Sequence, residues 1–162
     1  MSQSDFVARF GGVYEHSPWV AERAAQHLGT SMDFDQIAAL MADCVDNASY
    51  EQQLELIRAH PDLAGRAQVA GELTEASTEE QSSAGLDRCS SEEYERFQSL
   101  NDAYKKKFGF PFVMAVRNSS RSEILEAFAR RLENDPALEF ETALVEIHKI
   151  ARMRLEAIGL AQ

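Results

Sequence analysis

The chain has 162 residues, of which 44% are hydrophobic, and its formal net charge is -11 at pH 7. This length can bury one substantial core, and so acidic a chain is a poor nucleic-acid binder, because neutralising phosphates requires a basic face. No apolar run is long enough to span a membrane, and the chain shows neither a signal peptide nor a peroxisomal tripeptide, so we expect a cytoplasmic protein of bacterial type.

Helix signals recur along the chain. Apolar spacing and capping residues predict helices over residues 17–29, 33–48, 49–59, 90–109, 120–134 and 135–159. The residues predicted to cap their starts are Ser17, Ser49, Ser90, Ser120 and Asp135. Pro18 and Pro136 suit the first helical position, and glycines at 29, 109 and 159 are expected just after three of the helices.

Strand signals are almost absent. The one candidate is "FPFVMAVR", residues 110–117, and its periodicity does not decide between an extended segment and a buried turn of helix. We therefore predict an all-α fold, a single-domain helical bundle of about seven to eight helices over residues 1–162.

Familiar motifs for metals, nucleotides and nucleophiles are missing. The four histidines at 16, 27, 60 and 148 form no HxxxH or HExxH pattern, so no metal site is predicted. No glycine-rich phosphate loop or GxSxG elbow occurs. Cys44 and Cys89 form no CxxC pair, and we expect small packed side chains rather than a disulfide.

Three stretches remain as candidates, and each has a structural alternative. In "HPDLAG", His60 precedes a proline and is expected at a helix end, although a lone histidine is more often structural than catalytic. In "STEEQSSAGL", residues 77–86, Ser77 and Glu80 form a capping box, or Glu80 and Gln81 face a ligand at the N-terminal turn of that helix. "FGFPFVMAVR" is either a core segment ended by a surface Arg117 or backbone lining a pocket near Arg117.

Together these stretches resemble a known family. "AHPDLAGR", "STEEQSSAGLD" and "FGFPFVMAVR", in this order and spacing, are similar to the decarboxylases of 2-oxo-4-hydroxy-4-carboxy-5-ureidoimidazoline (OHCU), and "HKIARMRLEAIG" resembles the last helix of that family. The resemblance covers nearly the whole chain. It implies an all-α enzyme that performs the last step of urate breakdown to (S)-allantoin without a metal or organic cofactor.

The resemblance also implies roles for individual residues. His60 and Glu80 stand at the catalytic positions of the family. The positions that contact the small-molecule substrate are Pro61, Ser77, Gln81, Phe112, Val113, Met114, Ala115, Val116, Arg117 and Arg154, with the 112–116 segment contributing its backbone.

These residue types suit the implied chemistry. A histidine that titrates near neutrality can move protons, and Glu80 can orient a ring or ureido N–H. Gln81 both donates and accepts, as a ureide requires, and Arg154 offers a planar grip on a carboxylate or carbonyl. The competing hypothesis is a non-catalytic helical ligand-binding or interaction module on the same scaffold. The oligomeric state is left open, with a homodimer as one option.

Overall fold

The computed structural model describes residues 1–65 and 71–160, so Arg66, the last residue of "AHPDLAGR", lies outside the described part. The described residues form eight α-helices and one short 3-10 helix without any strand, which confirms the all-α prediction. No helix among them is long and apolar enough to cross a membrane. The chain divides into two compact units, residues 1–59 with 147–162, and residues 60–146.

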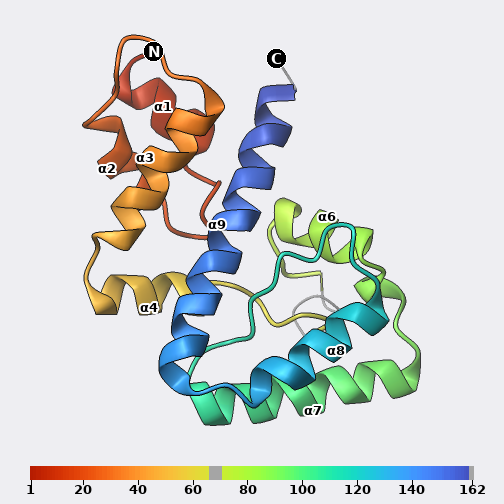
Figure 1. Cartoon of the computed structure of the whole chain (residues 1–162). Helices are drawn as coiled ribbons and strands as arrows, with labels where there is room; N and C mark the ends of the chain where they lie inside the picture. Colours follow the sequence, from red (N-terminus) through yellow and green to blue (C-terminus); the bar gives the residue numbers. More distant parts are fainter. Residues whose placement is uncertain (66–70, 161–162) are drawn as a thin grey trace. The chain divides into compact units, whose positions relative to one another are not determined.

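Unit 1 consists of the N-terminal helices and the end of the C-terminal helix (Figure 1). Its helices are α1 (Gln3–Phe10), α2 (Trp19–Ala25), α3 (Phe34–Asp46), α4 (Tyr50–Arg58) and the part of α9 (Pro136–Leu160) from residue 147 onward. α1 packs on α2 and α2 on α3. The fully buried Phe6, Phe10 and Met41 are among the side chains of this core.

Unit 2 contains α6 (Glu75–Ser83), the 3-10 helix η1 (Leu86–Arg88), α7 (Ser91–Phe108), α8 (Arg121–Leu132) and the first residues of α9. α7 packs on α8. Aromatic rings from three segments fill its core, and Tyr104 makes edge contacts with Phe112 and Phe128, which stack on each other with centroids 3.9 Å apart. α7 contributes Tyr104 to this aromatic core.

Most predicted helix starts are confirmed. Ser49, Ser90 and Ser120 are the N-caps of α4, α7 and α8, each in a complete capping box. Asp135 accepts a hydrogen bond from the N–H of Leu138 at the start of α9. Gly109 ends α7 in the left-handed conformation with φ 79°, as its predicted role requires.

Two predicted caps are wrong. Ser17 does not cap α2, because Pro18 holds the N-cap position and the Ser17 hydroxyl donates instead to the carbonyl of Glu15. Ser77 does not cap the helix that carries Glu80, because that helix begins earlier and Thr74 is its N-cap. In each case the serine is itself buried in the packed unit.

One additional helix and two helix ends also differ from the prediction. The short α1, capped by Ser2 with Asp5, was not predicted. α2 ends at Ala25, well before Gly29. α9 continues past Gly159, where a Cβ would lie 2.1 Å from the ring of Phe34. Glycine at 159 therefore permits close packing against α3 and does not end the helix.

Candidate active site

His60 lies just beyond the end of α4. The helix ends at Arg58 with Ala59 as its C-cap, so the histidine is not on the helix itself but in the turn that follows. Its side chain is buried, with 8% of its surface exposed. The proline at 61 explains this break, because the residue before a proline avoids the α conformation.

The loop behind His60, meaning the residues 61–65 that follow it in the chain, is held by the side chains of two glutamines. The N–H of Ala64 donates to Oε1 of Gln81 over 2.9 Å, and Nε2 of Gln81 donates to the carbonyl of Asp62 over 3.2 Å. The carbonyl of Ala64 accepts from Nε2 of Gln98 at 2.7 Å. Ala64 is thus bonded through both of its backbone groups, and it holds φ at 50°, which costs a non-glycine residue about 1–2 kcal/mol.

α7 adds two more contacts to the same loop. Nδ2 of Asn101, a buried side chain, donates to the carbonyl of Leu63 at 3.0 Å. The ammonium group of Lys105 lies 2.7 Å from the Asp62 carboxylate. Side chains from α6 and α7 therefore determine where the chain goes directly after His60, and a strained loop maintained in this way is typical of a functional site.

The predicted residues of α6 lie on one face of that helix. Ser77 and Gln81 are four residues apart and both buried, and Glu80 lies between them on the same side, half-buried. Glu80 is the sixth residue of α6. The expectation that Glu80 and Gln81 lie in the N-terminal turn is therefore wrong, and neither side chain is part of the cap.

The 110–117 segment has no regular secondary structure between α7 and α8. Phe112, Val113 and Val116 are buried, Met114 and Ala115 are half-buried, and Arg117 is exposed. The segment is therefore a core segment that ends at a surface arginine, as one alternative predicted, and Met114 and Ala115 are its less buried residues. The side chain of Phe112 belongs to the aromatic core, so any contact of this residue with a ligand would be through its backbone.

A buried ion pair lies against this segment. Nε of Arg131 donates to Oε1 of Glu139 at 2.6 Å, and the same oxygen accepts from the hydroxyl of Tyr104 at 2.6 Å. Nη1 of Arg131 donates to the carbonyl of Val113 at 2.6 Å. Burial raises the pKa of Tyr104, and its hydrogen bond to the Glu139 carboxylate adds to this, so the phenol remains a donor.

The comparisons with known proteins decide the family. The family model described as OHCU decarboxylase matches residues 1–156. The chain belongs to this family.

Individual relatives agree with this assignment. The 2-oxo-4-hydroxy-4-carboxy-5-ureidoimidazoline decarboxylase of Haloferax volcanii is 48% identical over 155 residues, which cover 96% of this chain and 89% of the relative. A crystal structure of (S)-allantoin synthase has a TM-score of 0.76 at 37% identity, over 98% of this chain and 51% of that one, so this chain spans about half its length. A crystal structure of OHCU decarboxylase in the presence of (S)-allantoin has a TM-score of 0.72 at 26% identity, covering 90% and 94%.

Arg154, the last of the positions expected from the family resemblance, belongs to unit 1. Its side chain is buried, and Nη2 lies 3.3 Å from Oε2 of Glu15. Nη1 donates over 3.5 Å to the carbonyls of Gly12 and Val13. The arginine is thus held by the chain between α1 and α2, and its contact with substrate stays a prediction.

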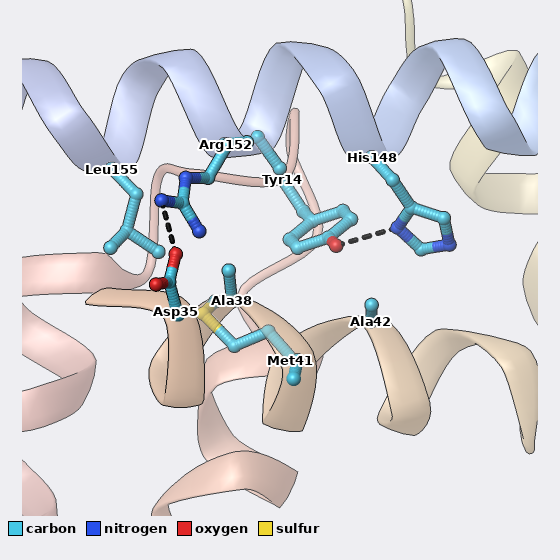
Figure 2. Close-up of a pocket in the computed structure, with 10 residues that line it drawn as sticks. Tyr14, Asp35, Ala38, Met41, Ala42, His148, Arg152 and Leu155 are labelled. Atoms are coloured by element: carbon cyan, nitrogen blue, oxygen red, sulfur yellow. Dashed lines mark hydrogen bonds and ion pairs between the residues drawn. The ribbon is translucent and has the colours of Figure 1, made fainter. Parts of the chain in front are cut away.

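Unit 1 also contains a pocket of about 380 Å³ between α3 and α9 (Figure 2). The hydroxyl of Tyr14 bonds to Nδ1 of His148 at 2.8 Å, and Nε2 of His148 lies 3.0 Å from Oδ1 of Asp46. Burial raises the pKa of Tyr14, and the charge of Asp46 adds to it. None of the predicted site residues lines this pocket. Sequence reasoning missed the Asp46–His148–Tyr14 chain because no local motif joins residues so far apart.

The remaining predictions concern thiols and metals. Cys44 and Cys89 are free and half-buried, and burial raises the pKa of both thiols. In the part of the chain that the structure describes, no group of three histidine, cysteine or acidic residues could hold a metal ion.

Proposed function

We propose that this chain decarboxylates OHCU to (S)-allantoin and CO2, the last step in converting urate to allantoin. The main support for the proposal is the pair of hydrogen bonds between the Gln81 amide and the loop that follows His60. These bonds tie the loop that begins with the histidine to the helix face that bears Glu80. Membership of the OHCU decarboxylase family supports the assignment of His60 and Glu80 to that reaction.

The chemistry of the substrate explains why so few groups suffice. OHCU carries a carboxylate and a hydroxyl on one ring carbon, next to a C=N bond. When the bond to the carboxylate breaks, its electron pair forms a new C=C bond, and the ring nitrogen of the C=N bond takes a proton. The hydroxyl then loses its proton as a carbonyl forms, and the neighbouring carbon gains one. We propose that no organic cofactor is needed, because the C=N bond is already an electron sink.

The residues have separate roles in this proposal. His60 passes the hydroxyl proton, and a second proton taken from solvent, to the ring nitrogen and the carbon, since imidazole can both accept and donate a proton. Glu80 accepts a hydrogen bond from a ring or ureido N–H and so orients the ring. Pro61, Ser77 and the backbone of the 112–116 segment bind the substrate. Gln81 retains one N–H and one lone pair for a ureide after its two bonds to the loop.

The alternative of a non-catalytic module is not favoured. A relative named as an OHCU decarboxylase is 48% identical, and the catalytic pair expected from the family is present as His60 and Glu80. A module that no longer turned over substrate would not need this pair next to a loop held by Gln81.

The deciding experiment is a turnover assay. OHCU is unstable, so it is generated in the cuvette from urate with urate oxidase and 5-hydroxyisourate hydrolase, and circular dichroism follows the appearance of (S)-allantoin. We expect micromolar protein to accelerate its formation well beyond the spontaneous rate, and heat-inactivated protein to have no effect. Formation at the spontaneous rate, or of racemic allantoin, would contradict the proposal.

A further inference from the structure

The backbone of residues 113–115 is held by two charged side chains from different helices. Nη1 of Arg131, on α8, donates to the carbonyl of Val113 at 2.6 Å. Oε1 of Glu146, on α9, accepts from the N–H of Ala115 at 3.1 Å. We propose that Arg131 and Glu146 are positioning residues that determine where this backbone meets the substrate. The inference rests on the proposed function, because that function makes the segment a binding element.

Arg131 is well suited to this role because it is held from three sides. Its side chain is 11% exposed and is paired with Glu139, whose side chain is fully buried. Its guanidinium carbon lies 4.3 Å from the centroid of the Phe112 ring. A planar guanidinium can donate to Glu139 and to Val113 while it stacks on Phe112, whereas an ammonium group cannot do all three. The carbonyl of Val113 thereby acquires a defined position relative to α8.

Stability alone does not account for this arrangement. A buried ion pair is weak evidence for stability, because apolar side chains of similar volume often stabilise a core as well. The 110–117 segment has no strand ladder, so its buried N–H and carbonyl groups need other partners. An arginine and a glutamate that each bond one of these groups restrict the segment to one placement, and binding through its backbone requires such a placement.

The first test compares two variants of the same buried cluster. Arg131→Lys keeps a positive charge for Glu139 but loses the planar donor set, and Tyr104→Phe removes a hydrogen bond to Glu139 without touching Val113. We expect both variants to have a lower Tm. Only Arg131→Lys should raise KM, by about fivefold or more, and its kcat should stay within about twofold of the wild type. A purely structural arginine would reduce the active fraction and leave KM unchanged, and that result would overturn its positioning role.

The second test uses Glu146 and applies even if Arg131→Lys does not fold. Glu146→Ala should raise KM about threefold or more. Glu146→Gln should restore the wild-type KM, because the amide oxygen still accepts from the N–H of Ala115. The control Glu141→Ala, at an exposed site on α9, should match the wild type. If the wild type is active and Glu146→Ala leaves KM unchanged, this inference is overturned and the proposed function is not. An inactive wild type would overturn the proposed function, and this inference with it.

Discussion

At the scale of single residues, we expect His60 to determine whether the proposed chemistry operates. The ring is buried in a turn whose backbone is held by Gln81 and Asn101, so a change at the ring leaves the loop contacts in place. His60→Asn keeps a hydrogen-bonding group but cannot transfer a proton, and we expect kcat to fall about 10²–10⁴-fold. Tm should change little, as measured by thermal denaturation. A His60→Asn enzyme with full turnover would remove the histidine from the mechanism.

Glu80 is tested by removing its charge alone. Because Thr74 caps α6, the Glu80 carboxylate is not part of a capping box, and Glu80→Gln should keep the N-cap and the fold. We expect kcat/KM to fall at least about tenfold, since an amide presents a donor as well as an acceptor to the substrate. Glu79→Gln, the same change at the exposed neighbouring position, is the control and should behave as wild type. An equal fall of kcat/KM in the two variants would indicate that the loss of negative charge in general, and not the Glu80 carboxylate, is responsible.

Arg154 is expected to matter more for binding than for folding. Lysine at this position still offers a positive charge to Glu15, so Arg154→Lys should fold normally. It lacks the planar fork of arginine, and we expect kcat/KM to fall at least tenfold, about 1.4 kcal/mol. Arg152→Lys changes a more exposed arginine two residues earlier, whose ion pairs contribute little, and should stay near wild type. A normal kcat/KM in Arg154→Lys would exclude the predicted contact.

At the scale of elements, α6 is a polar helix that depends on its N-cap. The Thr74 hydroxyl accepts from the N–H of Ser77 at 3.2 Å. Thr74→Ala should lower the free energy of unfolding by about 1 kcal/mol in urea titrations, the usual cost of a lost cap. Thr78→Ala, at an exposed site in the same helix, should change it by less than about 0.5 kcal/mol. Equal losses at the two positions would contradict the assignment of Thr74 as the cap.

The helix starts that were predicted correctly depend on residues three apart. Ser49 with Gln52, Ser90 with Glu93 and Ser120 with Glu123 bond each other's backbone, so local sequence is enough to identify them. Ser77 with Glu80 has the same spacing and the same residue types, yet α6 starts at Thr74. The pattern alone does not distinguish a cap from a serine that packing buries inside a helix.

At the scale of the whole molecule, each unit buries one tyrosine with a raised pKa, Tyr14 in unit 1 and Tyr104 in unit 2. The folded protein keeps these two protons at a pH where the unfolded chain releases them. Stability should therefore be unaffected by these groups below about pH 10 and should fall as pH rises above it, by about 1.4 kcal/mol per pH unit for each tyrosine.

Urea titrations at several alkaline pH values test this expectation. Tyr14→Phe and Tyr104→Phe should each reduce the slope of unfolding free energy against pH, and the double variant should reduce it further. Tyr104→Phe also loses its bond to Glu139, so its stability at neutral pH is compared separately. An alkaline slope that neither substitution changes would show that other groups govern it.

Motifs such as "AHPDLAGR" and "STEEQSSAGLD" were sufficient to predict the family, because a family resemblance depends on residue types in order along the chain, and the roles of His60 and Glu80 stay predictions. The contacts that place these residues were not predictable in the same way. We predict that Gln81 contacts a ureide, and the structure shows its amide bonded to the loop that follows His60. Nothing in the local sequence indicates these bonds of the Gln81 amide to the loop.

Helix type and most helix starts follow from residues within one turn of each other, which is why the sequence was enough for an all-α prediction. Other features join residues far apart, 17 positions for Gln81 with Ala64, 18 for Arg131 with Val113 and 134 for Tyr14 with His148. Such pairs form only when packed helices bring their side chains together. Tertiary packing alone therefore determined the loop behind His60 and the anchoring of the 113–115 backbone, because a buried polar group bonds whichever partner the fold places within reach.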